Sequence, residues 1–252
     1  MRRTACLAAS LAAVAIAAGC GGSSDSSKPT LTVSAAASLK IAFQSCATGF
    51  TDANVRFNFA GSDELAAQIR QGARPDVYAA ANTTLPNDLA VAGLLEAPVV
   101  FAGNRLVVAV PRDSQVGSVA ALAKPGTKVV AGEKGVPVGD YTLTVLGRLP
   151  AAERTAVLAN VRSREPDVLG IVGKLTQGAA DAGFAYTTDV VAMHGALRAV
   201  ELPASLQPRV EYGIGVVKGT KHEAQAKAFI DSLTAGPCRQ VMRQAGFEPP
   251  PG

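Results

Sequence analysis

The feature that most constrains the fold is a regular alternation of short β-rich segments with helical patterns. The β-rich segments are apolar and bounded by turn residues, as buried strands are. They lie at 31–37, 55–60, 76–81, 105–110, 128–132, 181–186, 197–202 and 210–217. Helical spacing of apolar residues predicts helices at 39–50, 63–71, 140–149, 166–177, 221–233 and 237–244. This alternation indicates an α/β fold with mostly parallel sheets that carry helices on both faces.

Composition supports an ordinary globular protein. The chain has 252 residues, of which 48% are hydrophobic and 17% charged, so it can bury the core of one or two domains. No repeat of solenoid length is visible, which excludes an array of small stacked units.

The N-terminal segment has the pattern of an export signal. Arg2 and Arg3 precede a mostly apolar run over residues 5–18. That run is shorter than the roughly 20 residues that a membrane-spanning helix needs, and it suits a cleavable signal peptide. We therefore expect an exported protein.

The end of this run resembles a bacterial lipoprotein signal. Small residues lead directly to Cys20, and a polar, flexible stretch follows. In that pattern cleavage precedes the cysteine, whose sulfur then carries a lipid. The resemblance implies a signal peptide over 1–19, a flexible tether over 20–30 and a lipid anchor on Cys20. The alternative is plain secretion of a soluble product.

The charge balance gives no support for a nucleic-acid partner. Without Arg2 and Arg3 the chain keeps 22 basic residues against 20 acidic ones, a formal charge of +2. It has no Trp, no block of like charges and no basic stripe interleaved with aromatic residues, which nucleic-acid binding favours.

An enzyme is not expected either. The sequence contains no GxSxG, no P-loop GxxxxGK[ST] and no cluster of metal ligands, the patterns that would indicate a hydrolase, a nucleotide enzyme or a metalloenzyme. The only histidines, His194 and His222, lie away from the motifs described below. We expect no cofactor.

Two cysteines remain for an oxidising compartment once Cys6 leaves with the signal and Cys20 is assigned to the lipid. Cys46 and Cys238 each lie on the apolar face of a predicted helix. If the two helices pack together, the cysteines can form a disulfide that adds at most roughly 4 to 5 kcal/mol by the chain-entropy model. Two buried free thiols are the alternative.

Small and polar residues recur where predicted strands end and helices begin. Ser38 follows 31–37, Gly61 and Ser62 follow 55–60, Gly139 precedes another helix, and Thr-Thr-Asp follows 181–186. Ligands of open α/β sheets gather at this edge, where free N–H groups and the positive end of a helix dipole attract anions. Taken singly, each serine is equally well explained as a helix cap.

Four stretches together resemble the periplasmic molybdate-binding proteins of molybdate ABC importers. They are AAASLKIAF, NFAGSDELAAQIRQGARPDVYAAAN, VPVGDYT and ADAGFAYTTDV, which stand in the family's order and at suitable distances. The resemblance extends over about 31–247. It implies a type II periplasmic binding-protein fold, in which two lobes enclose the ligand in the cleft between them.

The resemblance also implies where the chain divides. The segments at 105–110 and 210–217 are the expected crossings between the lobes, so lobe one comprises 30–107 plus 213–252 and lobe two 108–212. The last helix then returns to lobe one, which favours contact between Cys46 and Cys238. We expect a monomer.

The family's oxyanion contacts correspond to five residues of this sequence. They are Ser38 and Ser62 in lobe one, and Val138, Val168 and Tyr186 in lobe two. The serines supply hydroxyl and backbone donors, the valines backbone N–H groups and the tyrosine its phenol. Molybdenum would be held only as its oxyanion, through these donors, with no metal site in the protein.

The resemblance implies an extracytoplasmic lipoprotein, in the periplasm or on the cell surface, that captures molybdate or tungstate and delivers it to a membrane permease. The nearest alternative is another tetrahedral oxyanion, such as sulfate or a phosphonate. Asp63 and Asp140 stand beside the anion loops, where an inward carboxylate would repel the ligand. We expect both to point away, because an acid in the first turn of a helix is stabilised by the dipole.

Overall fold

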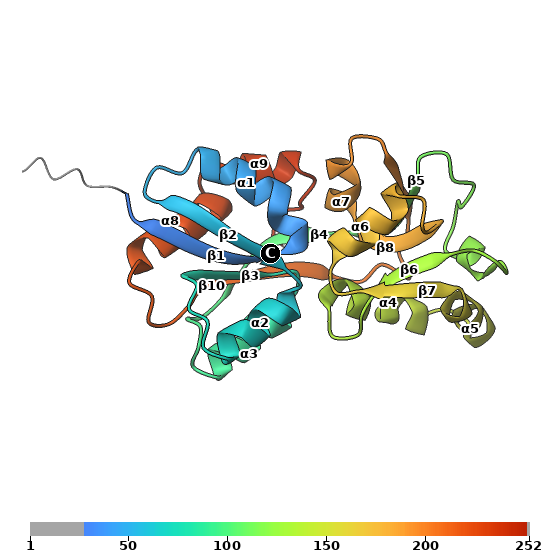
Figure 1. Ribbon diagram of the computed structural model, residues 1–252, viewed down its shortest axis with the longest axis horizontal. Helices are drawn as coiled ribbons and strands as arrows, with labels where there is room; N and C mark the ends of the chain where they lie inside the picture. Colours follow the sequence, from blue (N-terminus) through green and yellow to red (C-terminus); the bar gives the residue numbers. More distant parts are fainter. Residues whose placement is uncertain (1–27, 251–252) are drawn as a thin grey trace, which may run out of the picture.

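Two five-stranded sheets lie one after the other along the long axis of the molecule, each with helices on both faces (Figure 1). The computed structural model describes residues 28–250. The expected signal peptide and Cys20 lie outside this range, as does most of the expected tether.

The sheet of lobe one has the order β2-β1-β3-β10-β4. Its strands are β1 Thr30–Ala36, β2 Asn54–Ala60, β3 Val77–Ala80, β4 Val99–Asn104 and β10 Val210–Val216. Its helices are the 3₁₀ helix η1 Ala37–Leu39, then α1 Lys40–Thr48, α2 Ser62–Arg70, α3 Thr84–Val91, α8 Glu223–Thr234 and α9 Cys238–Gln244.

The sheet of lobe two has the order β7-β6-β8-β5-β9. Its strands are β5 Leu106–Pro111, β6 Val129–Gly132, β7 Val161–Glu165, β8 Ala182–Tyr186 and β9 Leu197–Glu201. Its helices are η2 Ala120–Ala123, α4 Pro137–Gly147, α5 Ala151–Ala159, α6 Val168–Thr176 and α7 Thr187–Ala192.

Both sheets are mixed. In lobe one β1 runs parallel to β2 and β3, whereas β10 runs antiparallel to β3 and β4. In lobe two β6 runs parallel to β7 and β8, whereas β5 runs antiparallel to β8 and β9. Strands joined by helices are thus parallel, as the alternation predicts. The strands that enter a lobe from the other one run in the opposite direction.

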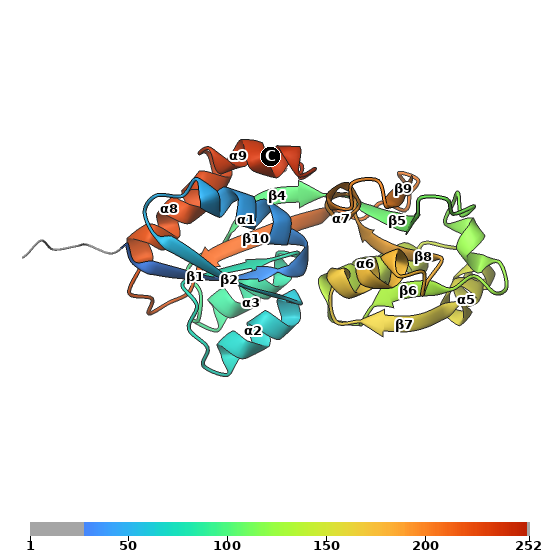
Figure 2. The same cartoon turned by 45° about the horizontal axis from the view of Figure 1, so that its top comes forward.

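The chain changes lobes at two points that lie side by side (Figure 2). Only Arg105 separates β4 from β5, and the chain returns between β9 and β10 over residues 202–209. Val210 pairs with Asn104, so the two connections are neighbours. The changes of sheet thus fall a few residues before the boundaries expected at 107 and 213.

The alternation of side chains along β3 explains why both faces of this sheet are covered. All four residues of β3 are buried. Val77 and Ala79 belong to the cluster that contains Phe43 of α1. Tyr78 and Ala80 belong to a second cluster with Leu65 of α2 on the other face. A strand of period two can therefore support a helical layer on each side.

Candidate functional site

The parallel strands β1 and β2 bring the two serines of lobe one to one edge. Ala36 pairs with Ala60 at the last residue of each strand, and Ser38 and Ser62 follow those ends in η1 and at the first position of α2. Ser62 is 2% exposed. Its Oγ accepts a hydrogen bond from the Ala81 N–H at 3.0 Å, and its carbonyl oxygen accepts one from the Tyr78 hydroxyl at 2.7 Å. These bonds leave the hydroxyl hydrogen of Ser62 available to a ligand.

Parallel strands also bring together the donors of lobe two. Gly132 pairs with Glu165 at the ends of β6 and β7, and α4 and α6 begin shortly after these ends. Val138 and Val168 lie in the first turns of α4 and α6. Their side chains are buried, while N–H groups in a first turn lack partners within the helix. What these valines offer at the edge is backbone N–H.

Tyr186 ends β8 at this edge and is the N-cap of α7. It is 1% exposed, and its hydroxyl has no hydrogen-bond partner within residues 28–250. Its ring packs edge-on against Tyr141 and Tyr212, with centroid distances of 6.4 and 5.9 Å. Burial raises the pKa of the Tyr186 phenol well above its ordinary value, so the group keeps its proton and can donate.

All five residues, Ser38, Ser62, Val138, Val168 and Tyr186, line one small cavity between the lobes. Its volume is about 20 Å³, far below the roughly 300 Å³ of ordinary small-molecule pockets. A cavity of this size suits a very small, compact ligand.

The cavity wall contains no cationic side chain among the described residues. Its polar members are the two serines, the tyrosine and one acid, Asp167. Asp167 is the N-cap of α6, and its Oδ1 accepts the Gly170 N–H at 3.0 Å. Sequence analysis did not identify Asp167 as part of the site. An acid directly before the apolar helical pattern at 168–175 would have indicated this cap.

The side chains of Asp63 and Asp140, the two acids beside the anion loops, differ in their exposure. Asp140 is exposed, and its Oδ1 accepts the Gly135 N–H at 2.9 Å. Asp63 does not line the cavity, but the expectation that it points to solvent is wrong for one oxygen. Asp63 Oδ1 is buried without a partner in the described part of the chain, beside Gly61. The reason is that lobe two packs against the start of α2, where the Pro166 carbonyl lies close to Gly61.

Asp189 lies directly behind Tyr186. It is 5% exposed, and its Oδ2 accepts the Tyr186 N–H at 2.9 Å. Burial is the main cause that raises the pKa of this carboxyl, the Tyr186 N–H opposes the shift and the negative charge of Asp167 adds to it, so that the pKa is about 7. The Asp189 carboxyl thus titrates near neutral pH.

A chain of hydrogen bonds reaches Ser38 from the crossing between the lobes. Ser38 Oγ lies 2.9 Å from the Tyr212 hydroxyl. Asn104 Nδ2 donates to the same hydroxyl at 3.3 Å, and to Thr188 Oγ1 of lobe two at 2.9 Å. Tyr212 and Asn104 were not identified from the sequence, because Tyr212 lies 174 positions from Ser38 and 108 from Asn104, and residues so far apart share no local pattern.

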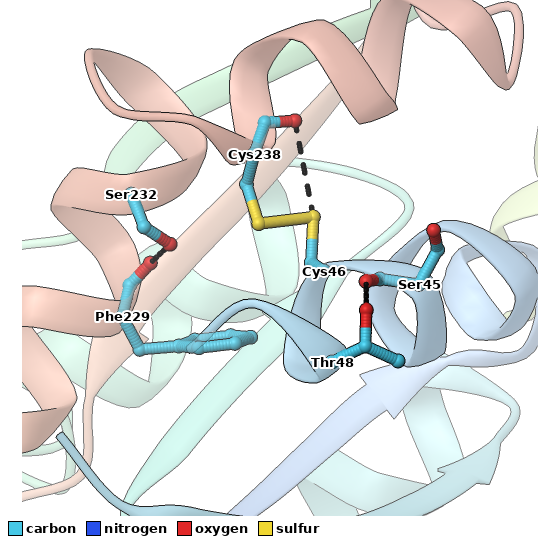
Figure 3. Close-up of a disulfide and its surroundings, with 6 residues drawn as sticks. All are labelled: Ser45, Cys46, Thr48, Phe229, Ser232 and Cys238. Carbon is cyan, nitrogen blue, oxygen red and sulfur yellow. Dashed lines mark hydrogen bonds between the residues drawn. A yellow bond between two sulfur atoms is a disulfide. The ribbon is translucent and has the colours of Figure 1, made fainter. Parts of the chain in front are cut away.

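Cys46 and Cys238 are joined as a disulfide between α1 and α9 (Figure 3). Their Cα atoms are 5.3 Å apart, and both residues are buried. The bond links the C-terminal helix α9 covalently to α1 within lobe one. Neither cysteine lines the cavity.

Neither a membrane-crossing helix nor a metal centre is found in the described part of the chain. None of the helices within 28–250 is both long and apolar enough to span a bilayer. Across the same residues, no three His, Cys, Asp or Glu side chains come together as metal ligands would.

Comparison with known proteins gives a family for almost the whole described chain. Residues 31–248 match the family of bacterial extracellular solute-binding proteins. The molybdate-binding protein ModA of Mycobacterium tuberculosis H37Rv is 35% identical over 246 residues, which cover 92% of this chain and 92% of that protein.

Solved structures agree on the fold. The periplasmic molybdate-binding protein of Azotobacter vinelandii has a TM-score of 0.77 at 20% identity, covering 88% of this chain and 100% of the other. The sulfate-binding protein SubI of M. tuberculosis H37Rv also has a TM-score of 0.77, at 17% identity, covering 88% and 87%. Two proteins named for different oxyanions thus fit equally well, so the fold alone does not select the ligand.

Proposed function

This chain belongs to the bacterial extracellular solute-binding proteins, as a non-enzymatic, molybdate-binding member that serves an ABC transporter, and from this premise we propose how and where it holds the anion. Molybdate, or tungstate of nearly the same size, binds in the cavity between the lobes. Ser38 and Ser62 donate from lobe one, and Val138, Val168 and Tyr186 donate from lobe two.

The observation that carries this assignment is the Tyr186 hydroxyl. It is a buried donor without an acceptor within residues 28–250, and it lines a cavity that four other predicted donors share. Leaving a buried hydroxyl unpaired costs about 1 to 3 kcal/mol. A ligand made of acceptor oxygens removes that cost, whereas a cation or an apolar ligand would not.

The chemistry of the wall fits a tetrahedral dianion. Neutral donors spread over two lobes match a charge that is shared among several oxygens, and they select by size and geometry. About seven charge-assisted bonds at roughly 1.5 to 3 kcal/mol each give a gross gain of about 10 to 21 kcal/mol. Association and lobe closure subtract at least about 4 kcal/mol, which leaves at most about 6 to 17 kcal/mol, a range that includes micromolar to nanomolar affinity.

Lobe closure is the proposed mechanism of capture. Donors from both lobes contact the anion only when the lobes are together, so the ligand stabilises the closed form. The two adjacent connections at Arg105 and 202–209 are the natural hinge. The closed form then docks on the membrane permease of the importer and releases the anion to it.

Outside the described residues, we propose that Cys20 carries a lipid that holds the protein at the outer face of the membrane. The support is the signal pattern before Cys20 and the extracellular family. Mass spectrometry of the protein purified from its native membrane tests this. A lipid on Cys20 supports the anchor, and a chain that is cleaved without lipid contradicts it.

Calorimetry tests the ligand. The purified protein is titrated in separate runs with molybdate, tungstate, sulfate and phosphate. Tight binding of the first two with little response to the others supports the proposal. A preference for sulfate, the ligand named for SubI, would retain the transport role and overturn the ligand.

A further inference from the structure

The hydrogen-bond chain behind Ser38 has a fixed direction. Arg105 N–H donates to Asn104 Oδ1 at 2.9 Å, which orients the amide so that Nδ2 faces Tyr212. An amide nitrogen only donates, so the Tyr212 hydroxyl is the acceptor of that bond. Asn104 is 4% exposed and Tyr212 is fully buried, so no solvent competes for these groups.

The single hydrogen of the Tyr212 hydroxyl then has one acceptor within the described contacts, Ser38 Oγ. The reverse direction, from Ser38 to Tyr212, would leave a buried phenol hydrogen unpaired, which is unfavourable. Burial also raises the pKa of Tyr212 well above its ordinary value, so the phenol stays protonated. Ser38 therefore accepts from behind and keeps its own hydrogen for the cavity.

Ser62, which follows the end of the neighbouring strand β2, also accepts a hydrogen bond from within lobe one. Its Oγ accepts the Ala81 N–H, so both serine hydroxyls have an internal donor behind them and a free hydrogen in front. Among residues 28–250, Asp167 is the only carboxylate that lines the cavity, and its Oδ1 accepts the Gly170 N–H at the cap of α6. A ligand that carries its own proton would therefore meet mainly hydrogens at this wall.

We propose that Tyr212 is a positioning residue that fixes the Ser38 hydroxyl as a donor toward the cavity, with Asn104 setting the direction of the hydrogen bonds. This inference rests on the proposed function of the cavity. It assigns control of the Ser38 hydroxyl to a side chain on β10 that is not among the residues lining the cavity.

A double-mutant cycle tests the role of Tyr212. Molybdate affinity is measured by calorimetry for the purified protein, for Tyr212→Phe, for Ser38→Ala and for the double variant. We expect Tyr212→Phe to weaken molybdate binding about 10-fold or more in the parent. Without the Tyr212 hydroxyl, the Ser38 hydroxyl is no longer held as a donor for its charge-assisted bond to the anion. In the Ser38→Ala background the same change should have less than about a twofold effect, since Tyr212 acts through Ser38.

A second readout separates this role from general damage. Near neutral pH inorganic phosphate carries at least one proton and molybdate carries none. Tyr212→Phe should lower the ratio of molybdate to phosphate affinity, because the Ser38 hydroxyl regains freedom to accept. Tyr186→Phe, which removes a direct donor, should weaken both ligands and change the ratio less.

Several outcomes would overturn the inference. Equal effects of Tyr212→Phe in both backgrounds, or an unchanged molybdate-to-phosphate ratio, would show that Tyr212 is only structural. If Tyr212→Phe fails to fold by circular dichroism, Asn104→Ala takes its place in the same cycle with the same expectation. If the parent protein binds no molybdate, the proposed function fails with the inference. If it binds and the cycle is additive, only the inference fails.

Discussion

Gly61 of lobe one lies directly against the Pro166 carbonyl oxygen of lobe two. A Cβ atom at position 61 would stand 2.6 Å from that oxygen, closer than any ordinary contact. The absence of a side chain at Gly61 therefore allows the two lobes to approach each other at this point.

Gly61→Ala should oppose closure and weaken molybdate binding by about 1 to 3 kcal/mol, the usual cost of forcing a methyl group into a packed contact. Calorimetry measures the affinity. Gly147→Ala is the matched control, since Gly147 lies in α4 with no atom within 4 Å of its added Cβ. An affinity for Gly61→Ala equal to that of the control would contradict the role of this contact.

Ser62→Ala removes a hydroxyl that points from the start of α2 into the cavity and also leaves the Ala81 N–H unpaired. We expect molybdate affinity to fall by about 1.5 to 3 kcal/mol. Ser45→Ala, at an exposed serine of α1, is the control and should bind as the parent does. Unchanged affinity in Ser62→Ala would sink the proposed role of the hydroxyl.

Tyr186→Phe removes only the unpaired hydroxyl. Binding should weaken by about 1.5 to 3 kcal/mol, while thermal stability without ligand should stay the same or rise, because no hydrogen bond within residues 28–250 is lost. Calorimetry and thermal unfolding are done on the same preparation. A variant that binds as tightly as the parent would make Tyr186 a structural residue.

Asp189 predicts a specific pH dependence of stability. Its pKa in the folded protein is about 7, above the ordinary value of 3.8, so between these values the folded state binds more protons than the unfolded state. Its contribution to the free energy of unfolding is therefore fully present below about pH 4 and is lost as the pH rises to about 7. Asp189→Asn keeps the shape of the side chain and removes the titration.

Denaturant unfolding of the parent and of Asp189→Asn at several pH values isolates this group. The difference in unfolding free energy, parent minus variant, should fall by a few kcal/mol from pH 4 to 7. A difference that is constant over this range would show that the folded pKa of Asp189 is near its ordinary value.

Replacing the disulfide should destabilise the protein without changing its ligand affinity. The Cys46→Ser, Cys238→Ser double variant should lose up to roughly 4 to 5 kcal/mol of unfolding free energy, the chain-entropy limit for so long a loop. Both positions lie in lobe one, away from the cavity. Stability equal to that of the parent, and insensitive to reductant, would contradict the bond.

Part of the candidate site could be predicted from the residues themselves. Strand ends are visible in a sequence, and parallel pairing brings them together, so Ser38 and Ser62 meet at one edge. Val138, Val168 and Tyr186 were predicted only through the resemblance to the family. The strand β7 was missed because its alternating sequence VRSRE is half exposed and has no apolar run. The strand β4 ends in Gly-Asn at the crossing and was not distinguished from a loop.

What the sequence could not predict depends on contacts between distant residues. The burial of Asp63 Oδ1 results from Pro166 of the other lobe, about a hundred positions away in the chain. The bond between Ser38 and Tyr212 joins η1, which follows the first strand of the sheet, to β10, its last strand in the chain. Secondary-structure propensity and hydrophobic periodicity describe the helix or strand to which a residue belongs, so they do not predict contacts between such distant pairs.

The position of β10 between β3 and β4 has a consequence for biogenesis. This interior strand is the last strand in the described part of the chain, so the sheet whose edge leads to Ser38 and Ser62 stays incomplete until nearly the whole polypeptide is available for folding. Lobe two is contiguous and can fold first, because domains form as units in the order in which they emerge. Lobe one, which contains the first site residues in the sequence, is thus the lobe that completes its folding last.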